Sequence, residues 1–388
     1  MANDSGYTES VWMSTPLPDF TPLQGTVRAD VCVIGAGIVG LTTAYLLSRE
    51  GQTVVVLDDG SVAGGASSRS TGHLASALDD RYVELERLHG MEGARLAASS
   101  HRAAIDLIES IVRRERIDCD FERVDGYLFA PPDESTEILH RELEAAQRAG
   151  LTDVQLSSNG PYSFFDTGPC LRFGEQAQFN PLAYLGALAR LICRSGSTIY
   201  TQSHVTHIDS DLPCCVATRY GAHVMADAIV VATNTPISNR VVVHTKQAAY
   251  RTYVIGIRIP IGSVKRVLAW DTSDPYHYLR VMEATDQSGD ILLVGGEDHK
   301  TGQQHDTDAC FERLETWTRN RVSLVWASHG TGRWIGVYWT QSAGHTERVY
   351  RHQRFWQRFN AWNHRRYANY RLDHGSRQSL GQTLQPQS

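Results

Sequence analysis

The sequence predicts an α/β fold in which one domain is built on a mainly parallel sheet and a second, α+β domain is built on a mostly antiparallel sheet. Residues 29–34 form a continuous apolar, β-branched run, and a glycine-rich turn separates them from helical apolar spacing at residues 41–50. A continuous apolar strand is typical of a parallel sheet that is covered on both faces. Strand-like runs at residues 250–259, 276–281 and 290–295 predict the second sheet.

Local signals predict the remaining elements in order. Gly51 ends the first helix, and residues 53–57 form the next apolar strand. Pro181 begins a helix that runs to Cys193, at a position where a missing N–H costs little. Further amphipathic helices are predicted at residues 82–116 and 133–149, and strands that return to the first sheet at 198–208, 216–218 and 228–232.

These elements predict four segments. Residues 1–26 form an N-terminal extension, residues 27–85 and 176–245 the first domain, and residues 86–175 and 246–318 the second domain. Residues 319–388 form a tail of different composition.

Composition excludes several classes of partner. The chain has 388 residues, a formal net charge of -6 and a pI near 6.2, so it offers no basic footprint for nucleic acid, and a small molecule is the expected partner. No run approaches the roughly 20 apolar residues of a membrane span, and residues 1–24 lack the pattern of a secretory signal. The 7 cysteines have no metal-ligand spacing, so we expect no metal and a reducing, cytoplasmic location. The oligomeric state is not predicted.

A glycine motif at residues 35–40 carries the strongest functional signal. Gly35-Ala36-Gly37-Ile38-Val39-Gly40 lies between a predicted strand and a helix, and Asp58 ends the following strand. Gly35 permits the tight turn, Gly37 lets the backbone approach a pyrophosphate, and Gly40 allows close packing of the helix. The helix N-terminus offers unpaired N–H groups to phosphate, and Asp58 is placed to accept hydrogen bonds from a ribose. The motif therefore predicts a Rossmann-type dinucleotide-binding domain.

A second motif favours FAD over NAD as the dinucleotide. Residues 65–73 form a small, hydroxyl-rich loop, Gly-Ala-Ser-Ser-Arg-Ser-Thr-Gly-His. The loop resembles the flavin-contacting segment of the D-amino-acid-oxidase-like superfamily, which includes glycine, sarcosine and glutamylputrescine oxidases. That family's segment runs roughly Gly-Ala-Ser-Gly-Arg-Asn-Ala-Gly, so Ser68 and Ser70 depart from it.

Two later segments agree with this resemblance, which spans residues 27–318 and implies an FAD-binding domain followed by a substrate domain. Val205 matches a strand that meets adenine, and Ala232-Thr233 matches a strand end beside the dinucleotide. The resemblance is greatest to a subgroup often fused to a Rieske domain, but this chain has no Cys-x-His pair and is expected to lack that domain. The predicted FAD contacts are Gly35, Gly37, Ile38, Val39, Gly40, Asp58, Asp59, Gly65, Ala66, Ser67, Arg69, Ser70, Thr71, Gly72, His73, Val205, Ala232 and Thr233.

The substrate-binding residues have weaker sequence signals than the FAD-binding residues. Chemistry in this family is hydride transfer from a carbon that bears an amine to the flavin, and a substrate carboxylate would favour a bidentate Arg with a Tyr nearby. Tyr276, Tyr278 and Arg280 form one candidate cluster, while residues 250–253 form another; for each residue, a purely structural role in a strand at the domain interface is the alternative. The second cluster consists of Tyr250, Arg251 and Tyr253, and His73 is a further candidate.

The tail has an unusual composition that predicts a shift of reading frame. From residue 322 onward there are nine Arg, no Lys, one Glu and one Asp, which gives +7 against -13 for the rest of the chain. Five of the 8 Trp lie here. Read one base later, each Trp codon becomes a Gly codon whatever follows, and with suitable synonymous codons residues 324–380 then give a C-terminus typical of the family. Five such glycines, at Trp326, Trp334, Trp339, Trp356 and Trp362, would coincide by chance about once in a million before allowance for the choice of alignment.

The sequence therefore predicts an FAD-dependent oxidoreductase that acts on an amine or amino acid. We hypothesise that the residues from about 320 onward are out of frame and poorly ordered. Two alternatives follow: a catalytically impaired pseudo-enzyme without its C-terminal closing element, and a genuine Arg/Trp-rich tail that binds a partner.

Overall fold

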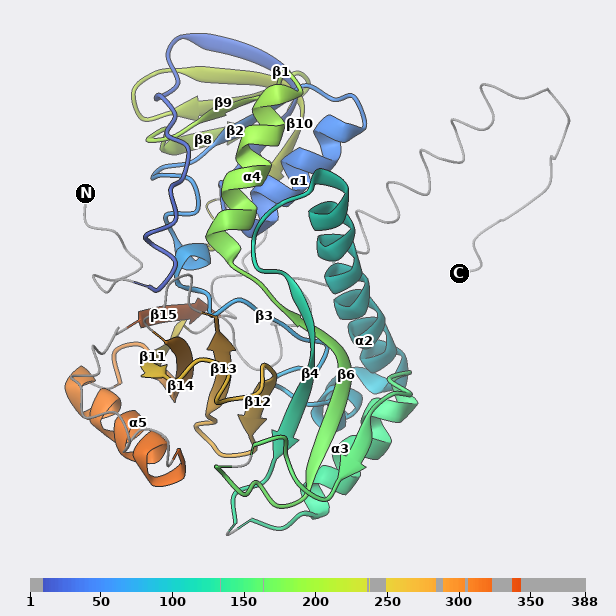
Figure 1. The fold of residues 1–388 in the computed structure, drawn as a ribbon. Helices are drawn as coiled ribbons and strands as arrows, with labels where there is room; N and C mark the ends of the chain where they lie inside the picture. The colour runs from blue at the N-terminus through green and yellow to red at the C-terminus, as the bar shows by residue number, and fades with distance from the viewer. Residues whose placement is uncertain are drawn as a thin grey trace, which may run out of the picture.

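The molecule consists of two sheets, each covered by its own helices (Figure 1). The computed structural model describes residues 10–132, 134–162, 164–235, 237, 249–283, 289–303, 306–322 and 337–342. In the view of Figure 1, the first sheet lies at the top with α1 (Ile38–Arg49) and α4 (Pro181–Arg194), and the second sheet lies below with α3 (Glu137–Arg148) and α5 (Thr307–Arg321). The α/β class with two mixed sheets confirms the predicted fold class.

The first sheet has the predicted parallel centre. Its strand order is β7-β2-β1-β10-β9-β8, and β1 pairs in parallel with both β2 and β10. The two outer strands β9 and β8 are antiparallel to their neighbours. The strands are β1 (Thr26–Ile34), β2 (Val54–Leu57), β7 (Thr198–Tyr200), β8 (Val205–Asp209), β9 (Cys214–Thr218) and β10 (His223–Val231).

The second sheet is antiparallel except for the pairing of β12 with β4. Its order is β15-β11-β14-β13-β12-β4-β6-β3, and β5 pairs with β6. The strands are β3 (His73–Leu74), β4 (Glu122–Phe129), β5 (Gln155–Ser157), β6 (Cys170–Gln178), β11 (Ala249–Ile259), β12 (Leu268–Asp271), β13 (Tyr278–Met282), β14 (Asp290–Lys300) and β15 (Val337–Ser342).

The helices agree closely with the sequence patterns. Helix α2 (Tyr82–Glu115) is kinked at Gly90, whose φ is 69°. The Asn180 side chain caps α4 by accepting hydrogen bonds from Leu182 N and Ala183 N, and Pro181 follows as the first helical residue. The sequence patterns do not include α5, which covers one face of β11 and β14.

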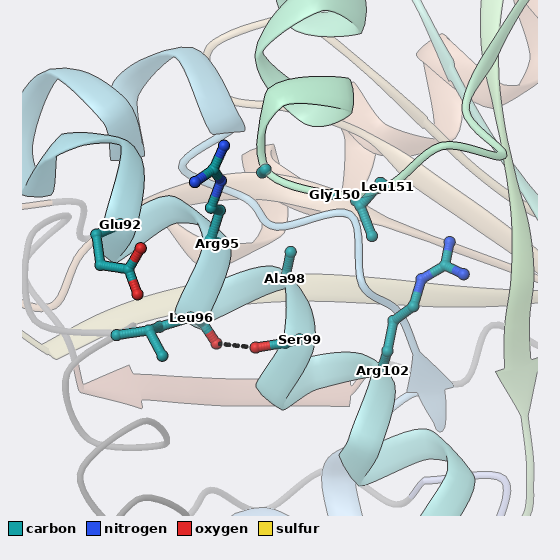
Figure 2. A pocket seen from close by; sticks show the side chains of 9 residues that line it. Glu92, Arg95, Leu96, Ala98, Ser99, Arg102, Gly150 and Leu151 are labelled. Carbon is teal, nitrogen blue, oxygen red and sulfur yellow. Dashed lines mark hydrogen bonds between the residues drawn. The ribbon is translucent and has the colours of Figure 1, made fainter.

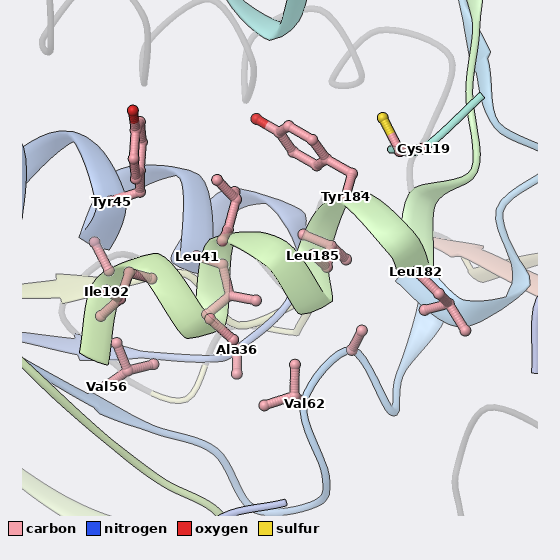
Figure 3. Close-up of a cluster of buried hydrophobic side chains, with 14 of the residues drawn as sticks. Ala36, Leu41, Tyr45, Val56, Val62, Cys119, Leu182, Tyr184, Leu185 and Ile192 are labelled. Atoms are coloured by element: carbon pink, nitrogen blue, oxygen red, sulfur yellow. The ribbon is translucent and has the colours of Figure 1, made fainter. Parts of the chain in front are cut away.

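The largest apolar core lies between α1 and α4 and continues into the second sheet. Figure 3 shows Leu41 and Tyr45 of α1 facing Leu185 and Ile192 of α4, with Val56 of β2 below them. The same cluster contains buried residues of β11, β13 and β14, namely Val254, Tyr278 and Leu293. A second cluster lies under α5. Apolar burial therefore holds the two sheets together as well as each one by itself.

The described residues of the tail form two pieces. Helix α5 ends at Arg321, and β15 pairs with β11 in antiparallel register. This strand belongs to residues 319–388, for which poor order is predicted; the rest of the predicted tail after residue 322 lies outside the described residues.

Candidate FAD site

The glycine turn has the close approaches that its sequence predicts. Gly35 has φ +109°, and a Cβ there would lie 2.9 Å from the Ala232 carbonyl oxygen. A Cβ on Gly40 would lie 1.7 Å from the Gly35 carbonyl oxygen, so only glycine fits at this position. Ile38 and Val39 form the first turn of α1 directly after Gly37. The turn thus leaves bare backbone at the N-terminus of a helix, an arrangement that suits a phosphate group.

Asp58 closes this turn from the end of β2. Its Oδ2 accepts a hydrogen bond from Ala36 N at 2.6 Å, and its Oδ1 accepts one from Gly60 N at 2.8 Å. Burial raises the pKa of Asp58, although these two backbone donors act in the opposite direction. A carboxylate has about four acceptor positions, so it can still accept hydrogen bonds from a ribose.

Two of the other predicted dinucleotide contacts adjoin Asp58. The backbone N–H of Ser203 donates to the Asp58 carbonyl oxygen at 2.7 Å, which brings the start of β8 at Val205 close to this loop. Asp59 Oδ2 lies 3.6 Å from His204 Nδ1. On the other side of the turn, Ala232 N donates to Ile34 O, and Thr233 N would lie 3.4 Å from a Cβ on Gly35.

The loop at residues 65–72 lies against the glycine turn. Ser67, in the short 3-10 helix η1 (Ala66–Arg69), accepts a hydrogen bond through its Oγ from Ile38 N at 3.1 Å. A Cβ on Gly37 would lie 3.1 Å from the same oxygen. The two motifs that predict the cofactor are therefore in direct contact, although about 30 residues separate them.

Arg280 supports the last part of this loop. Its Nη1 donates to the carbonyl oxygens of Thr71 at 2.7 Å, Gly72 at 2.9 Å and Phe179 at 3.3 Å. The residue is only 2% exposed, and burial lowers the pKa of its guanidinium to about 9. Arg280 is predicted as a partner for a substrate carboxylate; in the structure its Nη1 has backbone carbonyl partners, two of them in the loop.

His73 and Tyr278 meet where the loop joins the second sheet. Their rings pack edge to face with centroids 5.4 Å apart. His73 Nδ1 lies 3.0 Å from Thr71 Oγ1, and His73 Nε2 and the Tyr278 hydroxyl are both buried. Burial, followed by the charge of Arg280, lowers the pKa of His73 to about 3, so the ring is neutral at pH 7. Two buried polar side chains thus meet where the loop joins the second sheet, and a ligand there would find groups that can form hydrogen bonds.

The remaining substrate candidates are divided between the two faces of the second sheet. Tyr276 packs near Tyr278, with ring centroids 5.8 Å apart, on the face that carries His73. Tyr253 lies on the opposite face, where its ring stacks on His299 and packs edge to face on Phe311 of α5. Because side chains alternate along a strand, Arg251 shares the face of Tyr253, whereas Tyr250 shares that of Tyr278. Tyr250, Arg251 and Tyr253 thus do not form one cluster.

One buried group of charged residues was not predicted. His277 Nδ1 lies 3.0 Å from Asp271 Oδ2, and His277 Nε2 lies 3.8 Å from Glu297 Oε1. Arg313 of α5 donates to Glu297 Oε2 at 2.6 Å. The His277 ring stacks on Trp317 with centroids 4.4 Å apart. The sequence gives little signal for this group, because its members come from two strands, a loop and a helix.

The cavity in Figure 2 lies elsewhere. It has a volume of about 320 Å³ and lies between α2 and the end of α3, where Arg95, Ala98, Arg102 and Leu151 line it. Arg95 Nε donates to the Arg148 carbonyl oxygen, and Arg102 pairs with Asp153. None of the predicted cofactor or substrate residues lines this cavity. None of the helices in the described part of the chain combines the length and apolarity that a membrane crossing requires.

Comparison with protein families gives one match that covers most of the chain. Residues 30–361 match the family of FAD-dependent oxidoreductases. The match continues past residue 318, where the resemblance found from motifs is predicted to end. It supports the prediction of FAD as cofactor and gives no support to the pseudo-enzyme alternative.

Curated relatives resemble the chain over part of their own length. A protein described as a Rieske 2Fe-2S iron-sulfur protein, YhfW of Bacillus subtilis (strain 168), is 29% identical over 318 residues, which is 81% of this chain and 62% of that protein. Gamma-glutamylputrescine oxidoreductase of Escherichia coli (strain K12) is 30% identical over 227 residues, which is 57% of this chain and 53% of that enzyme. The chain therefore matches only about half to three-fifths of these proteins.

Solved structures share the fold at low sequence identity. Glycine oxidase from Geobacillus kaustophilus superposes with a TM-score of 0.64 at 18% identity, and covers 81% of this chain and 82% of that one. L-proline dehydrogenase from P. horikoshii gives a TM-score of 0.62 at 16% identity, with 83% and 82% covered.

Proposed function

The chain belongs to the FAD-dependent oxidoreductase family, and from that premise we propose that it oxidises a C–N bond of an amine or amino acid by hydride transfer to the flavin. The observation that carries the proposal is the contact of the glycine turn with the loop at residues 65–72, which leads into the buried side chains of His73 and Tyr278. When bound, FAD supplies the hydride acceptor.

The residues of the first domain fit the dinucleotide part of FAD. The bare turn at Gly35 and Gly37 and the N-terminus of α1 would hold the pyrophosphate. Asp58 would accept hydrogen bonds from the ribose, and Ser67 would lie beside the phosphates because its hydroxyl already contacts Ile38 N. The turn therefore offers uncharged N–H donors to the phosphates, and Asp58 offers a carboxylate acceptor to the ribose, as a dinucleotide requires.

The residues of the second sheet would bind and orient the substrate. The Tyr278 hydroxyl and the neutral His73 ring are buried polar groups that can each form a hydrogen bond with a ligand. Tyr276 extends this face of the sheet. Burial excludes water here and raises the pKa of Tyr278, so its hydroxyl stays protonated and acts as a hydrogen-bond donor.

The test begins with the purified full-length chain. We expect the protein to bind FAD, and its flavin absorbance to be bleached without oxygen by one class in a panel of primary amines, secondary amines and amino acids. A matched panel of alcohols and 2-hydroxy acids serves as control. Protein that gains no flavin spectrum with added FAD contradicts the proposal and supports the pseudo-enzyme alternative. Bleaching by hydroxy acids alone contradicts the C–N assignment.

We place this activity in a reducing compartment, the cytoplasm. All 7 cysteines are free thiols that are buried or half-buried, and burial raises the pKa of Cys32 to about 12. A buried thiol with a raised pKa such as that of Cys32 is an unreactive packing residue.

A further inference from the structure

The N-terminal segment before β1 packs on the first domain. Residues 10–24, called here the N-terminal strap, contain no helix or strand beyond a short turn. Near their C-terminal end, Leu23 N donates to Ser203 Oγ at 2.9 Å, beside the Asp58 loop. Leu17 packs on α4 next to Gly186. The strap therefore runs along the domain that would hold FAD.

The beginning of the strap attaches to the loop at residues 65–72. Ser10 Oγ donates to the Ser68 carbonyl oxygen at 2.6 Å, and Trp12 Nε1 donates to the Ser70 carbonyl oxygen at 2.7 Å. Both side chains come from residues that are nearly fully buried, at 6% and 2% exposure. Two carbonyls of the predicted flavin loop are thus held by donors that lie 58 residues earlier in the chain.

Trp12 also contacts the residue that holds the rest of this loop. The guanidinium carbon of Arg280 lies 5.4 Å from the centre of the Trp12 ring, a cation–π distance. Arg280 in turn donates to the Thr71 and Gly72 carbonyls. Trp12 and Arg280 together hold three consecutive carbonyls, from Ser70 to Gly72.

Holding these carbonyls sets the direction of the loop's N–H groups. In a trans peptide, the C=O and the following N–H point in opposite directions. A donor on the Ser68 carbonyl therefore turns the N–H of Arg69 away from the strap, and a donor on the Ser70 carbonyl does the same for Thr71. The loop could adopt other peptide orientations if these bonds were missing, because its residues are small and polar.

We propose that Trp12, assisted by Ser10, is a positioning residue of the FAD site, which fixes peptide orientations in the loop at residues 65–72 so that the N–H groups of Arg69 and Thr71 face the cofactor. This inference rests on the proposed function. It implies that FAD and the strap stabilise each other, because coupling between two sites is reciprocal.

The test compares two tryptophan variants in the full-length chain. Trp12→Phe keeps an aromatic ring beside Arg280 and removes the donor to Ser70. Trp317→Phe is the matched control, because Trp317 lies on α5 and stacks on His277, away from the strap. We expect the Kd for FAD, measured by flavin fluorescence titration, to rise about tenfold in Trp12→Phe, since a buried carbonyl loses its partner, and to change less than about twofold in the control.

A second measurement separates positioning from general stability. In the wild type, FAD should slow hydrogen exchange at the backbone amides of residues 10–24, and Trp12→Phe should reduce this protection. If Trp12→Phe does not fold, Ser10→Ala removes one hydroxyl only and should raise the Kd for FAD about threefold by the same mechanism.

The outcomes distinguish this inference from the proposed function. Wild-type protein that binds no FAD contradicts both. Wild-type protein that binds FAD, together with a Trp12→Phe variant that binds it equally tightly and shows the same exchange protection, contradicts the role of the strap alone.

Discussion

Single residues decide whether the backbone can approach a dinucleotide, and Gly37 is the sharpest case. Its Cβ position lies 3.1 Å from Ser67 Oγ, so a branched side chain would displace Ser67 and fill the space in front of the α1 N-terminus. We expect Gly37→Val to keep the circular dichroism spectrum of the wild type and to lose FAD binding in a fluorescence titration. Unchanged titration would contradict the placement of the pyrophosphate.

Gly40→Ala provides a contrast at the next glycine of the motif. Its methyl group would lie 1.7 Å from the Gly35 carbonyl oxygen, which forces the turn and the helix apart. We expect Gly40→Ala to be less stable than Gly37→Val. The midpoint of urea unfolding should therefore be lower for Gly40→Ala.

His73 is predicted to make stability depend on acidic pH. Its folded pKa, about 3, lies below the value of 6.5 for a free His. Between these values the unfolded chain binds a proton that the folded chain does not bind, so stability is lost as the pH falls from 6.5 towards 3. We expect His73→Gln to lose less unfolding free energy than the wild type between pH 7 and about pH 5 in urea titrations. Equal losses in the two proteins would show that His73 is not buried as a neutral ring.

At the scale of residues, the sequence predicts a position well where the backbone geometry admits only one residue type. Gly35 and Gly40 could be assigned to the turn because no side chain fits there. Arg280 was harder, because a guanidinium suits a substrate carboxylate and a row of backbone carbonyls equally well. The choice depends on the position of Thr71 and Gly72, which are more than 200 residues away in the chain.

At the scale of elements, an irregularity in β14 decides which side chains share a face. The pairing of β11 with β14 shifts between Arg251 and Tyr253, and Glu297 has φ +61°. This β-bulge turns Glu297 towards His277 and α5, while Asp298 reaches Thr252 on the other face. The alternation of the sequence alone does not reveal a bulge, so the group of His277, Asp271 and Glu297 could not be predicted.

This group predicts a stability change at neutral to alkaline pH. Burial acts to lower the pKa of His277, but the hydrogen bonds and charges of Asp271 and Glu297 outweigh it, and the net pKa is raised. A raised folded pKa contributes stability that is fully present below pH 6.5 and is lost as the pH rises through the folded value.

We expect His277→Gln to lower the unfolding free energy by about 1–3 kcal/mol at pH 6.5, and by less at about pH 9. His299→Gln is the matched control, because His299 lies on β14 two residues after Glu297, stacks on Tyr253 of β11, and has its Nδ1 3.3 Å from the Glu297 backbone oxygen rather than beside a carboxylate. Thermal unfolding at both pH values measures the difference. If His277→Gln loses the same unfolding free energy at both pH values, His277 stabilises the fold only by packing against Trp317.

At the scale of the whole molecule, the order of the elements could be predicted better than the contacts between the two sheets. Continuous apolar strands and a glycine turn identify the first sheet, because they are local signals. The site between the sheets depends on partners far apart in sequence, such as Trp12 with Ser70 and Arg280 with Gly72. No local pattern encodes these pairs, and the N-terminal extension therefore carried no functional prediction.

The nucleotide sequence tests the remaining hypothesis for the whole chain, that its coding frame changes near residue 320. The genetic code forces the five glycines opposite Trp326, Trp334, Trp339, Trp356 and Trp362, so the test depends on the residues between them. We expect the frame read one base later to be free of stop codons across residues 324–380 and to encode a strand, a glycine-rich turn and a helix.

Restoring that frame gives a functional measurement. The C-terminal element of such a flavoprotein would supply backbone donors and a helix N-terminus near the flavin, so we expect the restored protein to bind FAD more tightly than the chain as written. A fluorescence titration of both proteins with FAD compares the two Kd values. A stop codon early in the second frame would contradict the hypothesis. Equal affinity of the two proteins would show that the given chain, in which β15 pairs with β11, binds FAD without the C-terminal element of the restored frame.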